Sequence, residues 1–176
     1  MAKITFTTIC VFMVAAQSFA MSIVTSAGYG VMTQPASQYF HYTYNVSSTL
    51  YLYEDTLSIR AYIWQRPLFD TTHFQDQDTG EHLMAGYRFQ SYKQIFCNLY
   101  FGVGEIHGWV QRKIDQSKTS FQVFGSTSTI QVQYKFENFT ASIEHLLFIG
   151  RRSQLELDAK VLWPFSVTSI QLGYEI

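Results

Sequence analysis

The chain has 176 residues, of which 17% are aromatic and only 14% are charged, and its formal net charge at pH 7 is −1. One folded domain accounts for this length, and the near-neutral charge without a basic patch excludes the electrostatic footprint of a nucleic-acid-binding protein. Soluble domains carry about 25% charged residues, so this composition indicates a chain that is placed in an apolar environment.

The first 20 residues have the pattern of an export signal. Lys3 supplies a positive start, residues 4–16 are mostly apolar, and Ser18-Phe19-Ala20 forms a small–x–small cleavage site. An uncleaved membrane anchor is the alternative, but a helical span needs about 20 apolar residues and this run is shorter. We therefore expect a signal peptide over 1–20 and one mature domain over 21–176.

Beyond the signal, apolar and polar side chains alternate along most of the chain, which predicts β-strands with one apolar face. In the stretch 155–161, leucine, alanine and valine occupy one face, and Glu156, Asp158 and Lys160 occupy the other. The segments with this pattern are 23–32, 39–52, 57–64, 83–90, 95–104, 119–136, 139–149, 155–163 and 166–176.

The connections between these segments differ in length. We expect tight turns near residues 54, 92, 137 and 164, and longer polar loops over 65–80, 109–118 and 150–154. Short periplasmic turns alternating with longer external loops are typical of β-barrels in bacterial outer membranes. The apolar phase of segment 119–136 also switches near Gly125, which predicts a β-bulge.

Nine segments conflict with the even strand number of bacterial single-chain barrels. Eight strands result if residues 155–176 form one strand that is kinked at Pro164, and ten result if 119–136 splits at Gly125-Ser126. We favour eight, because the split leaves pieces shorter than the roughly 9–11 residues that cross a bilayer. The predicted fold is an all-β, closed, antiparallel up-and-down transmembrane barrel.

Several charged side chains fall on the face that we assign to the barrel interior. An eight-stranded barrel is just wide enough to be filled by side chains, and buried charges need partners. We expect a structural ion network, and a path for protons or substrate is the alternative. Its expected members are Arg60, Arg88, Glu144, Glu156, Asp158 and Lys160, with Glu175 nearby.

Aromatic residues concentrate near the ends of the expected strands. Such residues predict aromatic girdles at the two membrane interfaces. The set is Tyr39, Tyr51, Tyr53, Trp64, Tyr92, Phe136, Phe139, Trp163, Phe165 and Tyr174.

The last five residues, 172–176, resemble the C-terminal assembly signal of outer-membrane barrels, with Ile176 in place of the usual Phe or Trp. Together with 27–30 (Ala-Gly-Tyr-Gly) and the pair Glu144-His145, the chain resembles the small barrels that include the lipid A 3-O-deacylase family. That resemblance implies a hydrolase triad on the outer wall, in which His145 matches the histidine. Leu147 stands where the serine nucleophile belongs.

The resemblance leaves the triad incomplete. Glu156 is the nearest downstream acid, but the alternation directs it into the lumen. A hydrolase needs a nucleophile within hydrogen-bond reach of its base, and this strand supplies none. The candidate catalytic residues are therefore His145 and Glu156, without an identified nucleophile.

Together these patterns predict a bacterial outer-membrane barrel with a structural or lipid-interacting role and no open pore. The first alternative is a lipid A acyl-ester hydrolase, and the second is a soluble periplasmic barrel that binds an apolar ligand. The expected partners are outer-membrane lipid and lipopolysaccharide, not nucleic acid, and we expect a monomer without a cofactor or metal ion.

Overall fold

The computed structural model describes residues 22–33, 41–52, 56–152 and 162–176 of the chain, without the side chains of 151, 152, 162 and 163. These residues form eight strands and no helix long and apolar enough to cross a bilayer. The strands are β1 (Ser22–Thr33), β2 (His41–Leu52), β3 (Leu57–Asp70), β4 (Phe74–Tyr92), β5 (Ile95–Arg112), β6 (Lys118–Phe136), β7 (Phe139–Arg152) and β8 (Leu162–Glu175).

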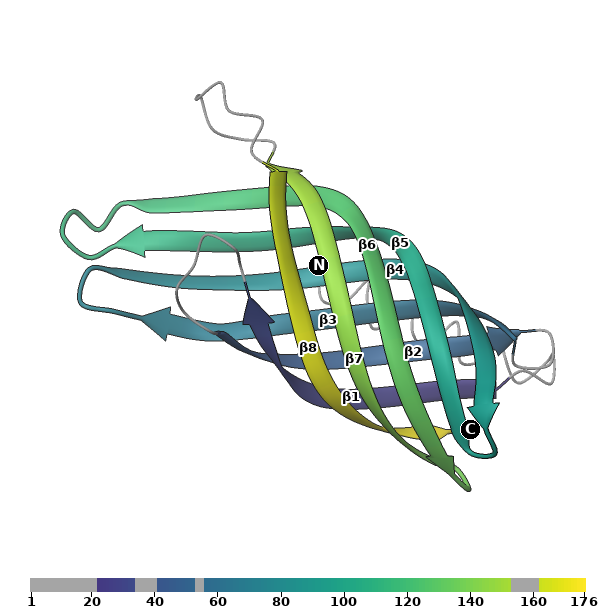
Figure 1. The fold of residues 1–176 in the computed structure, drawn as a ribbon. Helices are drawn as coiled ribbons and strands as arrows, with labels where there is room; N and C mark the ends of the chain where they lie inside the picture. The colour runs from purple at the N-terminus through teal and green to yellow at the C-terminus, as the bar shows by residue number, and fades with distance from the viewer. Residues whose placement is uncertain (1–21, 34–40, 53–55, 153–161) are drawn as a thin grey trace.

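The eight strands close into one barrel in chain order, with β8 paired back to β1 (Figure 1). Every neighbouring pair is antiparallel, as expected for strands joined by direct connections. The predicted fold class, a closed up-and-down antiparallel barrel of eight strands, is confirmed. The signal peptide expected over 1–20 lies outside the described residues, as do Glu156, Asp158 and Lys160.

The course of strand β6 contradicts two expectations from the sequence, the ten-strand alternative and the bulge near Gly125. It runs unbroken from Lys118 to Phe136, so the ten-strand solution is wrong. Its register with β5 and β7 passes Gly125 without a shift, so the predicted bulge is wrong as well. Phe121 and Val123 face the interior, and so do Thr127 and later odd-numbered residues. The alternation therefore continues, and only the chemistry of the interior changes along the strand.

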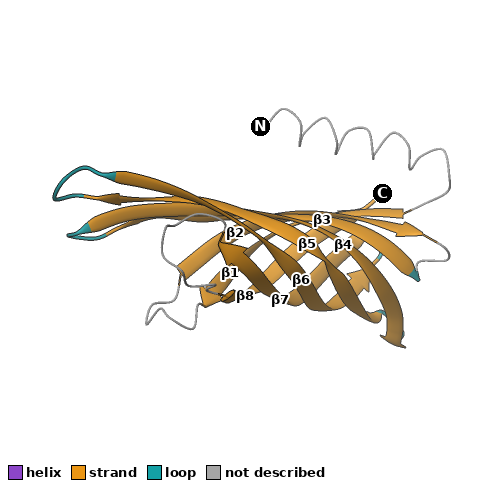
Figure 2. Ribbon diagram, turned by 90° about the horizontal axis from the view of Figure 1, so that it is seen from above, coloured by secondary structure: helices purple, strands orange, loops and turns teal. Residues whose placement is uncertain are grey.

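The predicted loop 65–80 is largely strand, and half of the predicted loop 109–118 is strand as well. β3 continues to Asp70 and β4 begins at Phe74, while β5 continues to Arg112 and β6 begins at Lys118. Strands β3 to β6 thus extend past the rest of the barrel as a four-stranded sheet, which we call the projecting sheet (Figures 1 and 2). Both faces of this sheet mix polar and apolar side chains, so its strands lack the regular alternation by which strands are recognised.

Local backbone features mark where the sheet departs from regularity. The β3–β4 register shifts between Arg66 and Phe69, a stretch that contains Pro67. Proline has no N–H to donate to the ladder, so a bulge or an edge is where it is tolerated. The opposite end of the barrel carries the tight turns at 93–94 and 137–138, where Lys93 and Glu137 adopt positive φ values of 39° and 53°. We call this end the short-turn end.

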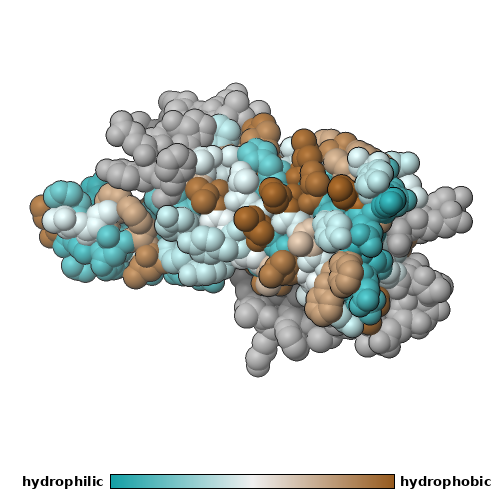
Figure 3. Space-filling view, turned by 60° about the horizontal axis from the view of Figure 1, so that its bottom comes forward, coloured by the Kyte–Doolittle hydropathy of each residue, from teal (hydrophilic) through white to brown (hydrophobic). Residues whose placement is uncertain are grey.

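The barrel wall has an apolar outer face. Large hydrophobic side chains are exposed on every strand, among them Phe101 at 66% and Leu172 at 69%. In Figure 3 hydrophobic residues gather over the middle of the visible face, and hydrophilic residues lie toward both ends. Polar side chains fill much of the interior instead, which reverses the arrangement of a soluble protein.

Candidate functional site

The interior nearer the projecting sheet is an apolar layer. Its aromatic and aliphatic side chains come from seven of the eight strands and are almost completely buried. Trp64 packs edge-on against Phe165, with ring centroids 5.3 Å apart, and Phe165 contacts Phe148 at 5.1 Å. The layer consists of Met32, Tyr62, Trp64, Met84, Tyr100, Ile106, Phe121, Val123, Leu146, Phe148, Phe165 and Val167.

One histidine lies within this apolar layer with both ring nitrogens engaged. The indole Nε1 of Trp64 donates to Nε2 of His82 at 2.9 Å, and Nδ1 of His82 lies 2.8 Å from Oγ1 of Thr127. Because Nε2 accepts, Nδ1 carries the proton in the neutral ring and donates it to the threonine hydroxyl. His82 is thus a satisfied structural histidine, which the sequence analysis did not single out.

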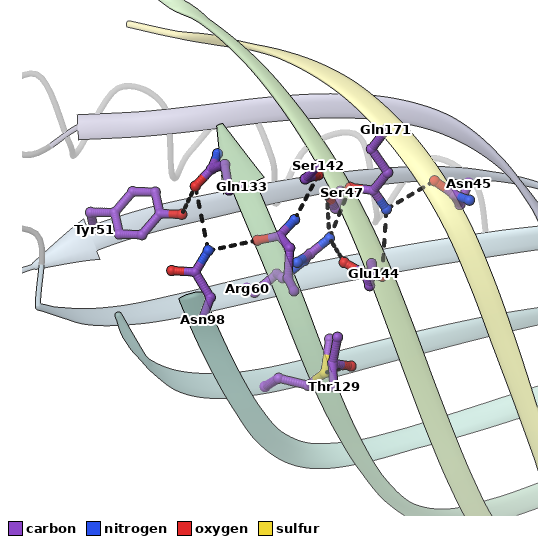
Figure 4. A network of polar contacts seen from close by, with 12 residues as sticks. Asn45, Ser47, Tyr51, Arg60, Asn98, Thr129, Gln133, Ser142, Glu144 and Gln171 are labelled. Atoms are coloured by element: carbon purple, nitrogen blue, oxygen red, sulfur yellow. Dashed lines mark hydrogen bonds and ion pairs between the residues drawn. The ribbon is translucent and has the colours of Figure 1, made fainter. Parts of the chain in front are cut away.

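An ion pair occupies the centre of the interior. Nη2 of Arg60 lies 2.5 Å from Oε2 of Glu144, and both side chains have no exposed surface. Nη2 also donates to Ser47 and Gln171, each at 3.0 Å (Figure 4). The rings of Tyr62 and Tyr100 lie 5.4 and 5.0 Å from the guanidinium carbon, which adds cation–π attraction.

Gln171, on β8, connects this pair to two side chains of β2, the strand on the other side of β1. Its amide nitrogen donates to Asn45 at 3.0 Å and to Oε1 of Glu144 at 3.5 Å, while its oxygen accepts from Arg60 and Ser47. The five side chains come from β2, β3, β7 and β8. The network therefore ties strands across the lumen, which no contact along the wall could do.

A second group of polar side chains lies between this network and the short-turn end. Oε1 of Gln133 accepts from Arg88 at 2.8 Å, Tyr51 at 3.3 Å and Asn98 at 3.4 Å. Asn98 also donates to Gln131 at 2.8 Å. The guanidinium of Arg88 stacks 4.2 Å from the centre of the Tyr51 ring. This arrangement immobilises long side chains across the lumen and fills it.

The interior residues predicted from the sequence are thus partly accounted for. Arg60 and Glu144 meet each other, and Arg88 faces the lumen and donates to Gln133. Glu175 pairs with Lys135 at 2.7 Å, close to the rim. The uncharged Gln131, Gln133 and Gln171, which carry much of the network, were missed because an isolated glutamine in a strand carries no distinctive signal.

The aromatic prediction needs correction at three positions. Tyr51, Trp64 and Phe165 point into the barrel and are at most 2% exposed, because they occupy inward positions of the alternation. Four of the other predicted girdle residues lie on the outer wall at the short-turn end: Tyr92, Phe136, Phe139 and Tyr174. Tyr39 and Tyr53 lie outside the described residues, and the side chain of Trp163 is not described.

His145 lies on the outer wall of β7, facing away from the interior network. Its register partners are Ile130 on β6 and Thr168 on β8. Nδ1 of His145 lies 2.9 Å from Oγ1 of Thr168, so the adjacent strand does place a hydroxyl beside the ring. Among the described residues no carboxylate pairs with His145, and a base without an orienting group is an incomplete hydrolase site.

A charged cluster at the mouth below the projecting sheet was not expected from the sequence. Nε of Arg66 lies 2.5 Å from Asp78, and Nη2 lies 2.8 Å from Asp76. His41 approaches the same guanidinium at 3.4 Å. Burial raises the pKa of the Asp78 carboxyl, an effect that Arg66 opposes. The polar loop predicted over 65–80 contains Asp76 and Asp78, which instead belong to β4 and meet Arg66.

No protein-family model matches the chain, and no curated protein matches its sequence. Solved structures do match its fold. The Yersinia pestis attachment invasion locus protein Ail, crystallised with the heparin analogue sucrose octasulfate, has a TM-score of 0.63 at 12% identity, covering 89% of this chain and 99% of Ail. Two further barrels match comparably.

Neisserial surface protein A has a TM-score of 0.62 at 9% identity, covering 89% of this chain and 96% of that protein. The N-terminal barrel domain of Pseudomonas aeruginosa OprF has a TM-score of 0.62 at 15% identity, covering 88% of this chain and 97% of that domain. The shared fold is that of small eight-stranded outer-membrane β-barrels.

Proposed function

We propose that this chain is an integral protein of a bacterial outer membrane, sealed to solutes, with a structural or lipid-interacting role. The observation that carries the proposal is the reversed barrel, in which a buried ion pair occupies the interior and large apolar side chains cover the outside. Only closed barrels and helices can satisfy every backbone group within a bilayer. The short-turn end then faces the periplasm, and the projecting sheet faces the exterior.

Exposed apolar surface argues against the soluble alternative. Soluble monomers seldom expose a contiguous apolar patch larger than a few hundred Å². Here the outward positions of neighbouring strands are apolar over several rows, including Val132, Ile143 and Ile170, which are 51%, 60% and 64% exposed. A soluble barrel for an apolar ligand would instead keep such residues inside.

The filled interior supports a sealed barrel. The apolar layer and the polar network lie one above the other, and both contain side chains from opposite walls. A continuous water path would need a channel through both layers. The proposed role therefore depends on the outer surface and the projecting sheet, with outer-membrane lipid and lipopolysaccharide as partners of a monomer.

Export is part of the same proposal. Residues 1–20 direct the chain across the inner membrane and are removed, so the mature protein begins at Met21.

A sulfated sugar analogue is bound by Ail, a protein of similar fold. That similarity supports looking for sugar ligands at the outer surface of this chain.

The test compares two lysine substitutions in cells. Ile143→Lys places a charge on the outer wall, where the cost in a bilayer is about 2–4 kcal/mol near the midplane. Ile114→Lys changes a residue that is 94% exposed beyond the barrel. We expect the parent and Ile114→Lys in the outer-membrane fraction with heat-modifiable gel mobility, and reduced assembly of Ile143→Lys. Recovery of the parent in the detergent-free periplasmic fraction would refute the proposal.

A further inference from the structure

A groove of about 450 Å³ lies on the projecting sheet, where it leaves the barrel. Side chains at alternate positions of a strand share a face, so residues 65 on β3, 77 and 79 on β4, 107 and 109 on β5, and 120 and 122 on β6 point outward together. Most of the groove lining consists of these outward residues. The groove therefore opens on the outside of the sheet, and Asp78, Gly108 and Phe121 complete its lining between the outward residues.

The groove begins directly beyond the apolar belt. On β4 and β5 the last outward apolar residues are Leu83 and Val103, which are register partners and are 56% and 66% exposed. The next outward pair is Glu81 and Glu105. Thr79 and His107 follow and already line the groove. In the proposed orientation this height is that of the polar headgroups of the outer leaflet.

The outward residues of the lining form two adjacent cross-strand rows. One row is Gln65, Thr79, His107 and Gln122, and the other is Gln77, Trp109 and Ser120. Amide, hydroxyl and imidazole groups offer both donors and acceptors, and the indole offers an apolar face with an N–H. Polar groups set around one aromatic anchor are the usual chemistry of a small-ligand site.

Contacts within the sheet hold part of the lining in place. Nζ of Lys118 lies 4.3 Å from the centre of the Trp109 ring, and Lys118 does not line the groove. Glu105 accepts from Gln122 and lies 3.2 Å from Nε2 of His107. Trp109 is only partly exposed. The aromatic anchor and its polar neighbours are therefore positioned before any ligand arrives.

The charge of the lining decides between ligand classes. No lysine or arginine lines the described groove, whereas the acidic Asp78 does, and Glu105 lies beside the lining residue His107. Phosphate or sulfate recognition relies on arginine and lysine, so an anionic group is disfavoured here. A neutral ligand with many hydroxyl groups and apolar C–H faces fits instead.

We propose that this groove binds sugar rings of lipopolysaccharide in the surrounding outer leaflet, with one ring stacked on Trp109 and its hydroxyls bonded to Gln77, Thr79 and His107. The choice of this source rests on the proposed function, which places the groove beside the saccharide of neighbouring lipids. Binding would order lipopolysaccharide around β3 to β6 and would fix the height of the barrel in the membrane.

The test uses the mature protein folded in detergent micelles and the core oligosaccharide of lipopolysaccharide, freed from lipid A and dephosphorylated. Saturation-transfer NMR and titration measure binding to the parent and to Trp109→Ala, Gln77→Ala and Trp109→Phe. We expect Trp109→Ala to weaken binding roughly tenfold, which corresponds to an aromatic contact of about 1.4 kcal/mol. Gln77→Ala should weaken sugar binding less than Trp109→Ala does, and Trp109→Phe should retain most of the parent's affinity.

Tyr134→Ala is the matched control, because Tyr134 is an outward aromatic on β6 in the half nearer the short-turn end and is 46% exposed. This variant should bind like the parent, and heat-modifiable mobility shows that each variant is folded. Failure of the parent to bind would overturn the proposal. So would a Trp109→Ala variant that binds no more weakly than Gln77→Ala. Binding only before dephosphorylation would identify a phosphate site and overturn it too.

Failure of the outer-membrane proposal is distinguishable from failure of the groove. Fractionation of cells reports on location without any sugar, whereas the micelle titration reports on the groove without a membrane. Binding by a protein that is found in the soluble fraction would keep the sugar site and reject its lipopolysaccharide source.

Discussion

At the scale of single residues, Arg60 shows what a charge inside the barrel requires. Its guanidinium meets Glu144, Ser47 and Gln171 and lies beside two tyrosine rings, with no exposed surface. Removing a charge from water costs several kcal/mol, and the partner recovers that cost only when its geometry is good. The pair is thus a strong constraint on which strands must face each other.

We predict that Arg60→Met lowers the free energy of unfolding by about 3–5 kcal/mol, because Glu144 is left as an unpaired buried charge. Urea titration followed by tryptophan fluorescence measures the change. Arg112→Met, at an exposed position near the tip of the projecting sheet, should have little effect. The double variant Arg60→Met, Glu144→Leu should recover part of the loss. Equal effects of the two single variants would show that Arg60 is solvated.

His145 is the second residue with a specific prediction. We expect His145→Ala and Thr168→Val to leave lipid A acylation unchanged, since the pair lacks an orienting carboxylate among the described residues. Mass spectrometry of lipid A from cells that express each variant measures this. If parent cells lose one acyl chain and His145→Ala cells retain it, the hydrolase alternative becomes the better explanation.

At the scale of elements, the two hairpins of the projecting sheet are tied together at their tips. Lys113, in the turn after β5, forms an ion pair with Asp70 at the end of β3, and its backbone N–H donates to the carbonyl of His73 at 2.9 Å. The hydrogen bond from Lys113 and a further one from Gln75 lower the pKa of Asp70 below its ordinary value of 3.8. The ion pair between Lys113 and Asp70 should therefore weaken when Asp70 is protonated in acid.

Because the folded-state pKa of Asp70 is lowered, its stabilising contact is complete above about pH 4 and is lost as the pH falls through the lowered value. We predict faster hydrogen exchange of the Lys113 amide in acid, after correction for the intrinsic pH dependence of exchange. Asp70→Asn should show the faster exchange at every pH. A corrected rate for the parent that does not change with pH would contradict this account.

The same elements show where sequence patterns stop being informative. Within the barrel the outer face is apolar and the inner face is largely polar, so strands such as 57–64 and 95–104 alternate and could be predicted. Beyond the apolar belt both faces of β3 to β6 are polar or mixed, and predicted loops proved to be strand. There the strands persist because each one is hydrogen-bonded to a neighbour, which is a property of the assembled sheet.

At the scale of the whole molecule, the two interior layers predict a barrel that does not conduct. The apolar layer excludes ions, and the polar network below it is held by fixed partners. We expect no steady ion conductance when the purified protein is inserted into planar bilayers. Trp64→Ala with Phe148→Ala removes two large side chains from the apolar layer and should raise leakage. Steady conductance by the parent would show that the interior is open.

The sequence by itself determined the all-β class and the inward or outward direction of most barrel residues, because alternation is a local property with a period of two. It also placed Arg60 and Glu144 on inward positions. Only the tertiary structure decided that these two side chains meet, and that Gln171 joins Arg60 from 111 residues away. Barrel closure determines which strands face each other across the lumen, and no local pattern encodes those distances.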